Sequence, residues 1–157
     1  MLKYAVWQWD NNKGELEEAI RADRTLNSCD YKHLVQLVIR HILNGKNRMT
    51  DFEHEDWSEE VHEIDDGHYR GTLIFAISLM TYQPGAHEYL FTTVDYGSCS
   101  VCDLLQSMQG PDYDIHPREE QVMDFMALCK DLVTRLVQPF PGYGFELEQC
   151  EMPKEDE

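Results

Sequence analysis

The sequence predicts an α+β fold: a small antiparallel sheet of three to four strands, packed by two main helices plus shorter helices. Two β-like runs, residues 72–79 and 87–96, follow one another across a turn, which is typical of an antiparallel hairpin. Two segments, residues 30–45 and 117–138, repeat apolar side chains every three or four residues, as helices do. The chain has 157 residues, 42% of them hydrophobic, which is enough for one core, so we expect a single domain over residues 1–157.

The N-terminal segment predicts a strand and then a short helix. Residues 2–9 are rich in aromatic and β-branched side chains, which favours a strand, with a short helix as the alternative. Residues 15–26 follow Gly14 and carry acids in their first turn, as helices prefer, and the pattern ends near Asn27. The first helix is therefore expected to start after Gly14.

A second helix is predicted to begin at Ser28 or Asp30, either of which can cap it, and to end at Gly45. Its apolar stripe consists of Leu34, Leu37, Val38, His41 and Ile42. A histidine within such a stripe is more often packed at the edge of a core than used as a ligand.

The middle of the chain predicts the sheet. Residues 72–79 are nearly all apolar, which suits a central strand covered on both faces. The turn at Gln83–Gly85 returns the chain into residues 87–96. Residues 61–65 are expected to add a third strand before a turn at Asp66–Gly67.

The C-terminal third predicts two more helices. A capping box, Ser100 with Asp103 three residues later, predicts a short helix after the returning strand. Pro117, followed closely by two acids, is expected to begin the longest helix of the chain. Residues 140–149 are expected to form a last strand, and residues 151–157 a frayed acidic tail.

The charge of the chain limits its function. It has 30 acidic and 13 basic residues, a net charge of −17, and so lacks the clustered Lys and Arg that binding to nucleic-acid phosphates needs. A basic protein partner is the natural expectation. Residues 51–66 contain nine acids and no Lys or Arg. The usual structural explanation of such a run is a solvated loop and edge strand whose charges discourage aggregation.

Cys99 and Cys102 form a Cys-x-x-Cys knuckle at the predicted junction between strand and helix. Such a knuckle can direct two sulfurs at one Zn²⁺, which needs two further ligands. Cys129 is a candidate third ligand because its helix is expected to pack near the knuckle, but a cysteine on an apolar stripe is equally well explained as a small core residue. Candidates for the fourth ligand are His116, His87, and one of the pair His62 and His68.

Thiol redox chemistry is an alternative role for the knuckle, because thioredoxin-like enzymes also place Cys-x-x-Cys between a strand and a helix. The intervening pair is Ser-Val instead of Gly-Pro, and Asp95 and Asp103 oppose thiolate formation unless a cation is present. Two buried thiols without a ligand are a third explanation. The chain has no Gly-rich phosphate loop, Gly-x-Ser-x-Gly elbow or His-Glu-x-x-His motif, so we do not expect an enzyme.

Cysteine usage and hydropathy point to a cytoplasmic protein. The number of cysteines is five, which is odd, and the N-terminus has no charged-then-apolar leader, so a reducing compartment is expected. The longest apolar run is far shorter than the ~20 residues that span a bilayer. We therefore expect no membrane partner.

Four phrases resemble a known family: IDDGHYRGTLIF (64–75), TYQP (81–84), VDYGSCSVCDLLQ (94–106) and ALCKDL (127–132). They are similar to small acidic proteins encoded by phages and prophages of Gram-positive bacteria, over roughly the central two thirds of the chain. Size and charge also resemble the type II-A anti-CRISPR proteins, which inhibit Cas9. The resemblance implies a structural Zn²⁺ and a cysteine ligand where Cys129 stands, while a histidine of the family pattern is replaced by Asp131 here.

The resulting hypothesis is an acidic inhibitor that acts in the host bacterial cytoplasm. It would bind a basic surface of Cas9 or of its guide-RNA complex and block nucleic-acid loading or cleavage, because acids can occupy channels lined with Lys and Arg. The expected metal ligands are Cys99, Cys102 and Cys129. The expected partner-binding residues are Glu53, Glu55, Asp56, Trp57, Glu59 and Glu60, with Trp57, Phe52 or an exposed Tyr as the aromatic anchor. The alternatives are a zinc-stabilised phage accessory or regulatory protein without a role against host defence, and a Cys-x-x-Cys thiol oxidoreductase.

Overall fold

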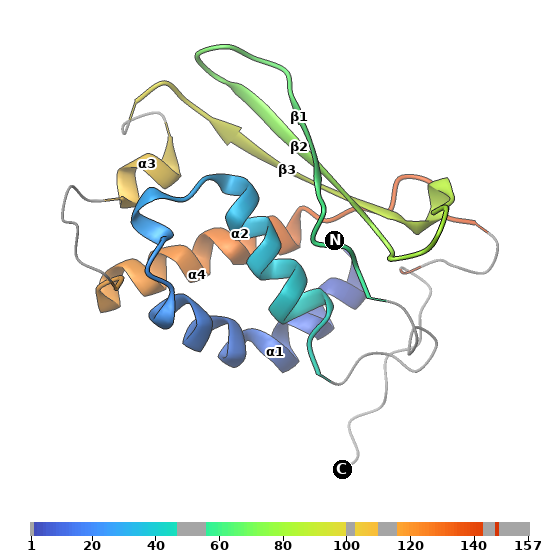
Figure 1. Ribbon diagram of the computed structural model, residues 1–157, viewed down its shortest axis with the longest axis horizontal. Coiled ribbons are helices and arrows are strands. Elements are labelled where there is room, and N and C mark those ends of the chain that lie inside the picture. Colours follow the sequence, from blue (N-terminus) through green and yellow to red (C-terminus); the bar gives the residue numbers. More distant parts are fainter. Residues whose placement is uncertain (1, 47–55, 100–102, 110–115, 143–146, 148–157) are drawn as a thin grey trace.

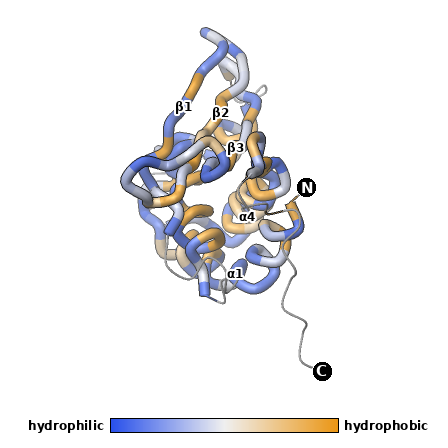
Figure 2. Tube along the Cα trace, turned by 90° about the vertical axis from the view of Figure 1, so that its right-hand side faces the viewer, coloured by the Kyte–Doolittle hydropathy of each residue, from blue (hydrophilic) through white to orange (hydrophobic). Residues whose placement is uncertain are grey.

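The protein has the α+β architecture that the sequence predicts. The structure is a computed structural model that describes residues 2–46, 56–99, 103–109, 116–142 and 147. Its elements in chain order are α1 (Lys3–Ala22), a 3₁₀ turn (Leu26–Ser28), α2 (Tyr31–Val38), a π-helical turn (Ile39–Leu43), β1 (His62–Asp65), β2 (Gly71–Ser78), a 3₁₀ turn (Ala86–Glu88), β3 (Tyr89–Tyr96), α3 (Leu104–Met108) and α4 (Glu119–Thr134). Helices α1, α2 and α4 lie together on one side of the sheet (Figure 1), and a side view shows sheet and helices as two layers (Figure 2).

The N-terminal segment is one continuous helix, so the predicted strand at residues 2–9 and the helix start after Gly14 are both wrong. The buried residues of α1 recur at helical spacing: Tyr4, Ala5, Gln8, Trp9, Asn12, Leu16 and Ile20. Two of them are polar, and both are hydrogen-bonded. Gln8 Nε2 donates to Leu43 O at 3.3 Å, and Asn12 Nδ2 donates to Gln8 O at 2.9 Å. Because its stripe contains these two polar residues, α1 does not show the regular apolar repeat from which a helix is recognised.

Replacing Gly14 with alanine is expected to raise the free energy of unfolding by about 0.5–1 kcal/mol, because glycine costs that much relative to alanine inside a helix. A methyl group added at Gly14 meets no atom within 4 Å. Urea denaturation measures the change. Gly45→Ala is the control and is expected to destabilise, since its Cβ would lie 2.5 Å from Asn12 Cγ and 2.6 Å from His41 O. A loss of stability in Gly14→Ala would contradict the placement of Gly14 in open space.

The second helix begins as predicted. Asp30 caps α2 by accepting a hydrogen bond from His33 N at 3.0 Å, and the helix continues into the π-helical turn that ends at Leu43. His41 is half-buried at the edge of the core. Burial, followed by the charge of Arg40, lowers the pKa of His41.

The sheet has the order β1-β2-β3, with both pairs antiparallel. The side chains of Leu73, Phe75 and Ile77 on β2 lie on the face that packs against the helices, and Thr92 Oγ1 on β3 donates to Leu132 O of α4 at 2.7 Å. None of the described helices covers the opposite face (Figure 1), and on it Ile64 is 53% exposed. The central position of β2 is therefore confirmed. Among the described residues its cover differs from the expectation, because the helices pack on one face alone.

The C-terminal helices differ from the prediction in detail. Asp103, not Ser100, is the N-cap of α3, because its side chain accepts a hydrogen bond from Gln106 N at 3.2 Å. Ser100 lies outside the described residues. The longest helix is α1 with 20 residues, and α4 has 16. The predicted last strand and acidic tail fall largely or wholly outside the described residues.

The protein has one hydrophobic core cluster. Buried side chains from the N-terminal helices, the central sheet and α4 all contribute to it. Next to it, Val137 extends the sheet by a single bridge, in which Phe91 and Val137 exchange two backbone hydrogen bonds of 2.9 Å. In the part of the chain that the structure describes, no helix has both the length and the apolar character needed to cross a membrane.

Candidate functional site

A pocket of about 730 Å³ lies where the predicted acidic segment meets the end of β2. We call it the acidic pocket. Its described lining consists of Asn44, Asp56, Trp57, Ser58, Glu59, Glu60, His62, Ser78, Leu79, Met80, Thr81, Pro84 and Tyr89. This lining contains three carboxylates and no Lys or Arg. It therefore joins the acidic segment to apolar and aromatic side chains of the β2–β3 hairpin.

Backbone hydrogen bonds fix the acidic segment against the sheet. Trp57 forms a β-bridge with Leu79, and Met80 N donates to Asp56 O at 2.7 Å. The side chain of Asn44, just after the π-helical turn, accepts from Trp57 N at 2.7 Å and donates to Trp57 O at 2.8 Å. These bonds satisfy the backbone of Trp57 at a point where the chain leaves regular pairing. The pocket wall is thus held by both the helical layer and the sheet.

The position expected for Trp57 must be corrected. Its side chain is 3% exposed, and its Nε1 donates to Tyr4 Oη at 3.3 Å. Burial of a large aromatic ring in the core is more favourable than its exposure to water. Trp57 therefore forms the floor of the pocket and cannot project toward a partner as an anchor.

Glu59 also differs from the expectation. It forms a two-pronged ion pair with Arg40, with Nε to Oε1 at 2.9 Å and Nη2 to Oε2 at 2.7 Å. The hydrogen bonds from Arg40 lower the pKa of Glu59. Its charge is already balanced within the chain, so Glu59 has little to offer to a cationic partner.

Five exposed carboxylates remain along the segment, and we call them the acidic face: Asp56, Glu60, Glu63, Asp65 and Asp66. The hydroxyl of Tyr96 donates to Asp65 Oδ1 at 2.6 Å and, with the amide of Gly67, lowers the pKa of Asp65. Glu63 and Asp65 also line a second pocket of about 430 Å³. The predicted partner-binding residues Glu53 and Glu55 lie outside the described residues.

Two exposed side chains at the acidic pocket are absent from the residues that the sequence predicts for the site. Met80 is 65% exposed and Tyr82 is 98% exposed. Between them, Thr81 has a buried Oγ1 without a hydrogen-bond partner in the described part of the chain. The sequence signal for Tyr82 is its place directly before the turn at Gln83–Gly85, because connecting segments run over the surface of a protein.

The second pocket is lined by residues that flank the cysteine knuckle on both sides, Gly97 and Ser98 before it and Asp103 after it. Asp103 is only 5% exposed, and its carboxylate accepts from Tyr31 Oη at 2.8 Å and from Gly97 N at 3.3 Å. Asp103 N in turn donates to Cys99 O at 2.9 Å. Burial is the main cause of the raised pKa of Tyr31, which keeps its hydroxyl a donor. Asp103 therefore anchors the knuckle to α2 through Tyr31.

The cysteines do not assemble around one point in the described residues. Cys99 is exposed, Cys129 is fully buried in the core, and Cys102 lies outside the described residues. Burial raises the pKa of Cys129 to about 12, and electrostatic repulsion from nearby Cys29 adds to this effect. The Cys129 thiol lies in the apolar core and Cys99 lies at the surface, so Cys129 as a zinc ligand stays a prediction. Across the described ranges, no three His, Cys, Asp or Glu side chains come together as a metal site.

Zinc binding by the knuckle stays a prediction that metal analysis can test. If Cys99 and Cys102 bind zinc, protein purified from zinc-replete cells contains about one zinc per chain, and Cys99→Ser removes it. Cys129→Ala decides whether Cys129 is the third ligand, because a ligand lowers the zinc content when it is removed and a core thiol leaves it unchanged. Elemental analysis measures all three proteins. Purified protein without zinc would contradict the prediction.

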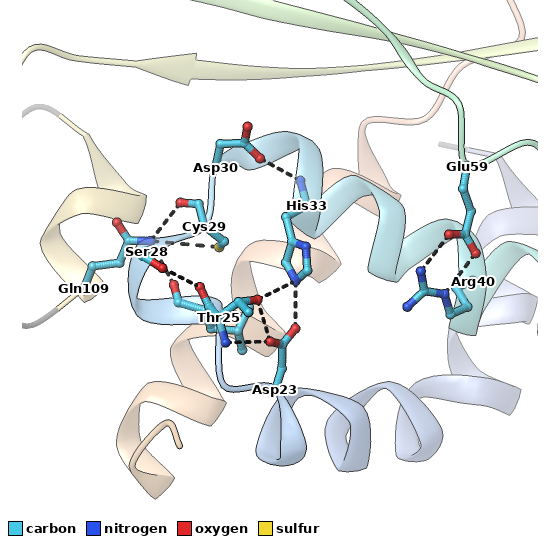
Figure 3. Close-up of polar contacts among 10 residues, drawn as sticks. Asp23, Thr25, Ser28, Cys29, Asp30, His33, Arg40, Glu59 and Gln109 are labelled. Atoms are coloured by element: carbon cyan, nitrogen blue, oxygen red, sulfur yellow. Dashed lines mark hydrogen bonds and ion pairs between the residues drawn. The ribbon is translucent and has the colours of Figure 1, made fainter. Parts of the chain in front are cut away.

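A cluster at the corner between α1 and α2 combines His, Asp and Cys (Figure 3). Asp23 Oδ1 accepts from Thr25 N at 2.8 Å, and Asp23 Oδ2 lies 2.7 Å from His33 Nε2. Burial, then Asp23 and Asp30, raises the pKa of Cys29 to about 12, so its thiol is not an activated nucleophile. The cluster is therefore explained as a structural corner.

Asp23→Asn is expected to lower the free energy of unfolding by about 1 kcal/mol at neutral pH, because it removes a hydrogen-bonded charge. Burial by itself would raise the pKa of Asp23, but the bonds from His33 and Thr25 hold it below its usual value. A lowered pKa adds stability above the unfolded pKa, and this stability is lost as the pH falls below about 4. Denaturation from neutral pH downward measures the difference, with the exposed Asp10→Asn as control. A deficit that persists unchanged in acid would contradict the assignment.

Comparison with known proteins leaves the site to be interpreted from its own geometry. No protein-family model, curated protein or solved structure matches the chain. The chemistry that the described residues offer is an anionic surface beside a mixed polar and aromatic pocket. Such a surface suits binding to a cationic group.

Proposed function

We propose that the chain is a binding protein whose acidic face docks onto a basic surface of a partner protein. One observation supports this most strongly: carboxylates of the acidic face line two pockets whose described linings contain no Lys or Arg, Asp56 and Glu60 the acidic pocket and Glu63 and Asp65 the second. Negative potential of this kind attracts Lys and Arg side chains and accelerates association. The net charge of −17 extends the same attraction beyond the contact surface.

The acidic pocket gives this attraction a defined geometry. Glu60 supplies a carboxylate, and the aromatic ring of Tyr89 lines the same space. A Lys or Arg side chain placed there would meet both an opposite charge and an aromatic face. Tyr82, almost fully exposed beside Thr81 of the lining, is an aromatic anchor of the type enriched at binding hot spots.

The most specific form of the proposal follows from the family resemblance. The partner is then Cas9 or its guide-RNA complex in the host bacterial cytoplasm, and the carboxylates take the place of nucleic-acid phosphates in a channel lined with Lys and Arg. The chain acts by occupying this channel and performs no reaction of its own.

Binding and inhibition can be measured with purified components. The full chain is added to Cas9 before or after the guide RNA, and both complex formation and cleavage of target DNA are followed. The expected result is a stable complex and reduced cleavage. If Cas9 does not bind but a different purified basic host protein does, the partner is another one and the accessory-protein alternative is favoured. If no basic protein binds, the proposal is wrong.

A further inference from the structure

The outer edge of β1 has backbone groups with no partner in the described part of the chain. Among the described strands β1 pairs with β2 alone, and all four of its residues are exposed. The other edge of the sheet differs, because Phe91 of β3 uses its outward N–H and C=O to bond Val137. An unpaired edge of this kind is a template for an additional strand.

The pairing register shows which groups face outward. Asp66 N donates to Thr72 O, so Asp66 and Thr72 form a hydrogen-bonded pair. In an antiparallel ladder, hydrogen-bonded and non-hydrogen-bonded pairs alternate, which assigns every other pair of β1 and β2. His62 and Ile64 fall in the bonded positions, with their N–H and C=O groups directed at β2. Glu63 and Asp65 fall in the non-bonded positions, so their N–H and C=O groups point away from the sheet. An added strand could therefore form four backbone hydrogen bonds.

The side chains of β1 restrict what kind of strand fits. Glu63 and Asp65 lie on the helix-side face of β1, because they are opposite the buried Phe75 and Leu73. Ile64, opposite Ile74, lies on the uncovered face. Residues directly across from Glu63 and Asp65 in an added strand would meet carboxylates, and opposite charges stabilise such cross-strand pairs. A second copy of β1 would instead place carboxylates close to carboxylates.

β1 also connects the two pockets. Its first residue, His62, lines the acidic pocket, and Glu63 and Asp65 line the second pocket. The segment has no Lys or Arg from residue 56 to residue 66. A strand added along β1 would therefore run from the acidic pocket to the second pocket, both of which are lined by carboxylates.

We propose that the basic partner contributes an extended segment that adds to the sheet as a fourth strand along β1, with Lys or Arg at alternate positions and apolar residues between them. This inference rests on the proposed function and specifies how its acidic face is used. The backbone hydrogen bonds supply affinity that does not depend on the sequence of the added strand, and the alternating charges select the partner.

The test uses synthetic peptides of alternating arginine and valine, added to the full chain. One peptide is unmodified, and its matched control carries N-methyl groups on the two backbone amides that face β1, which removes these donors and leaves every charge in place. We expect N-methylation to weaken binding by about tenfold or more, since two hydrogen bonds are lost. Amide hydrogen exchange at Glu63 and Asp65 is expected to slow when the unmodified peptide binds.

Two variants test the same edge from the side of the protein. Glu63→Gln removes the charge and keeps the outward N–H, whereas Glu63→Pro removes both. Proline is tolerated at this position because the N–H of Glu63 is not part of the β1–β2 ladder. Strand addition predicts that Glu63→Pro binds the peptide about tenfold more weakly than Glu63→Gln.

The outcomes separate this inference from the proposed function. Equal binding of the two peptides, or of the two variants, would overturn strand addition while the charge-based docking stands. If neither peptide binds, strand addition is also overturned, and the Cas9 experiment decides the proposed function independently. Sedimentation that shows a dimer abolished by Glu63→Pro would make a second copy the occupant and overturn the basic strand.

Discussion

Replacing Glu60 and Glu63 together with lysine is expected to weaken binding to the basic partner by about 10- to 100-fold. Each replacement removes an attractive charge and adds a repulsive one, and the loss should appear mainly as slower association. Neither carboxylate has an ion-pair or hydrogen-bond partner among the described residues, so the fold should be unaffected. Lysine is also well tolerated on an edge strand such as β1.

The matched control for this double variant is Glu120→Lys with Asp124→Lys on α4. Both residues are exposed and lie outside the two pockets. Their replacement changes the net charge of −17 by the same amount as the first double variant. If docking depends on the acidic face, the control keeps nearly all of its affinity. Biolayer interferometry gives both rate constants. An equal loss in the two variants would mean that total charge, and not the acidic face, determines binding.

Trp57→Ala is expected to lower the free energy of unfolding by about 3–5 kcal/mol, a large part of the stability of an ordinary domain. The ring is 3% exposed in the core, and its removal leaves a cavity between Tyr4 and the end of β2. Trp57→Phe keeps most of the apolar surface and loses the hydrogen bond from Nε1, so a deficit of about 1–2 kcal/mol is expected. Denaturant titrations measure both.

Trp57→Phe also separates stability from binding. Because the ring is only 3% exposed and is not a surface anchor, the folded variant is expected to bind the partner within about twofold of the unmodified chain. Tyr82→Ala, at a side chain that is 98% exposed, should do the reverse and reduce affinity without loss of stability. A stability change near zero in Trp57→Ala would contradict the burial of Trp57.

The sheet could be predicted because its signals are local. The apolar run at residues 72–79 indicates a central strand, and the Pro-Gly turn sets the hairpin. The run does not reveal which face of β2 the helices cover, because Ile74 and Ala76 are as apolar as Leu73 and Phe75. The Asp30 cap of α2 is likewise a signal of neighbouring residues. The single helix α1 was missed because Gln8 and Asn12 occupy buried positions of its stripe, where only contacts with residues such as Leu43 make a polar side chain acceptable.

The candidate site could be predicted only in part. Its acidic character is visible in residues 56–66, but the pairing of Glu59 with Arg40 joins side chains 19 residues apart and has no sequence signature. The burial of Trp57 depends on Tyr4 and Asn44, which approach it only in the folded chain. The core position of Cys129 follows its apolar stripe, whereas the pattern alone could not distinguish a ligand from a core thiol.

The salt dependence of binding to the Cas9–guide complex tests the electrostatic docking most directly. Raising the ionic strength from about 0.1 M to about 1 M shortens the screening length from about 10 Å to about 3 Å, so attraction between exposed charges largely disappears. We predict an affinity at least about tenfold lower at the higher salt, and a much smaller change for the variant with lysine at positions 60 and 63. An affinity that stays the same across this range would contradict docking through the acidic face.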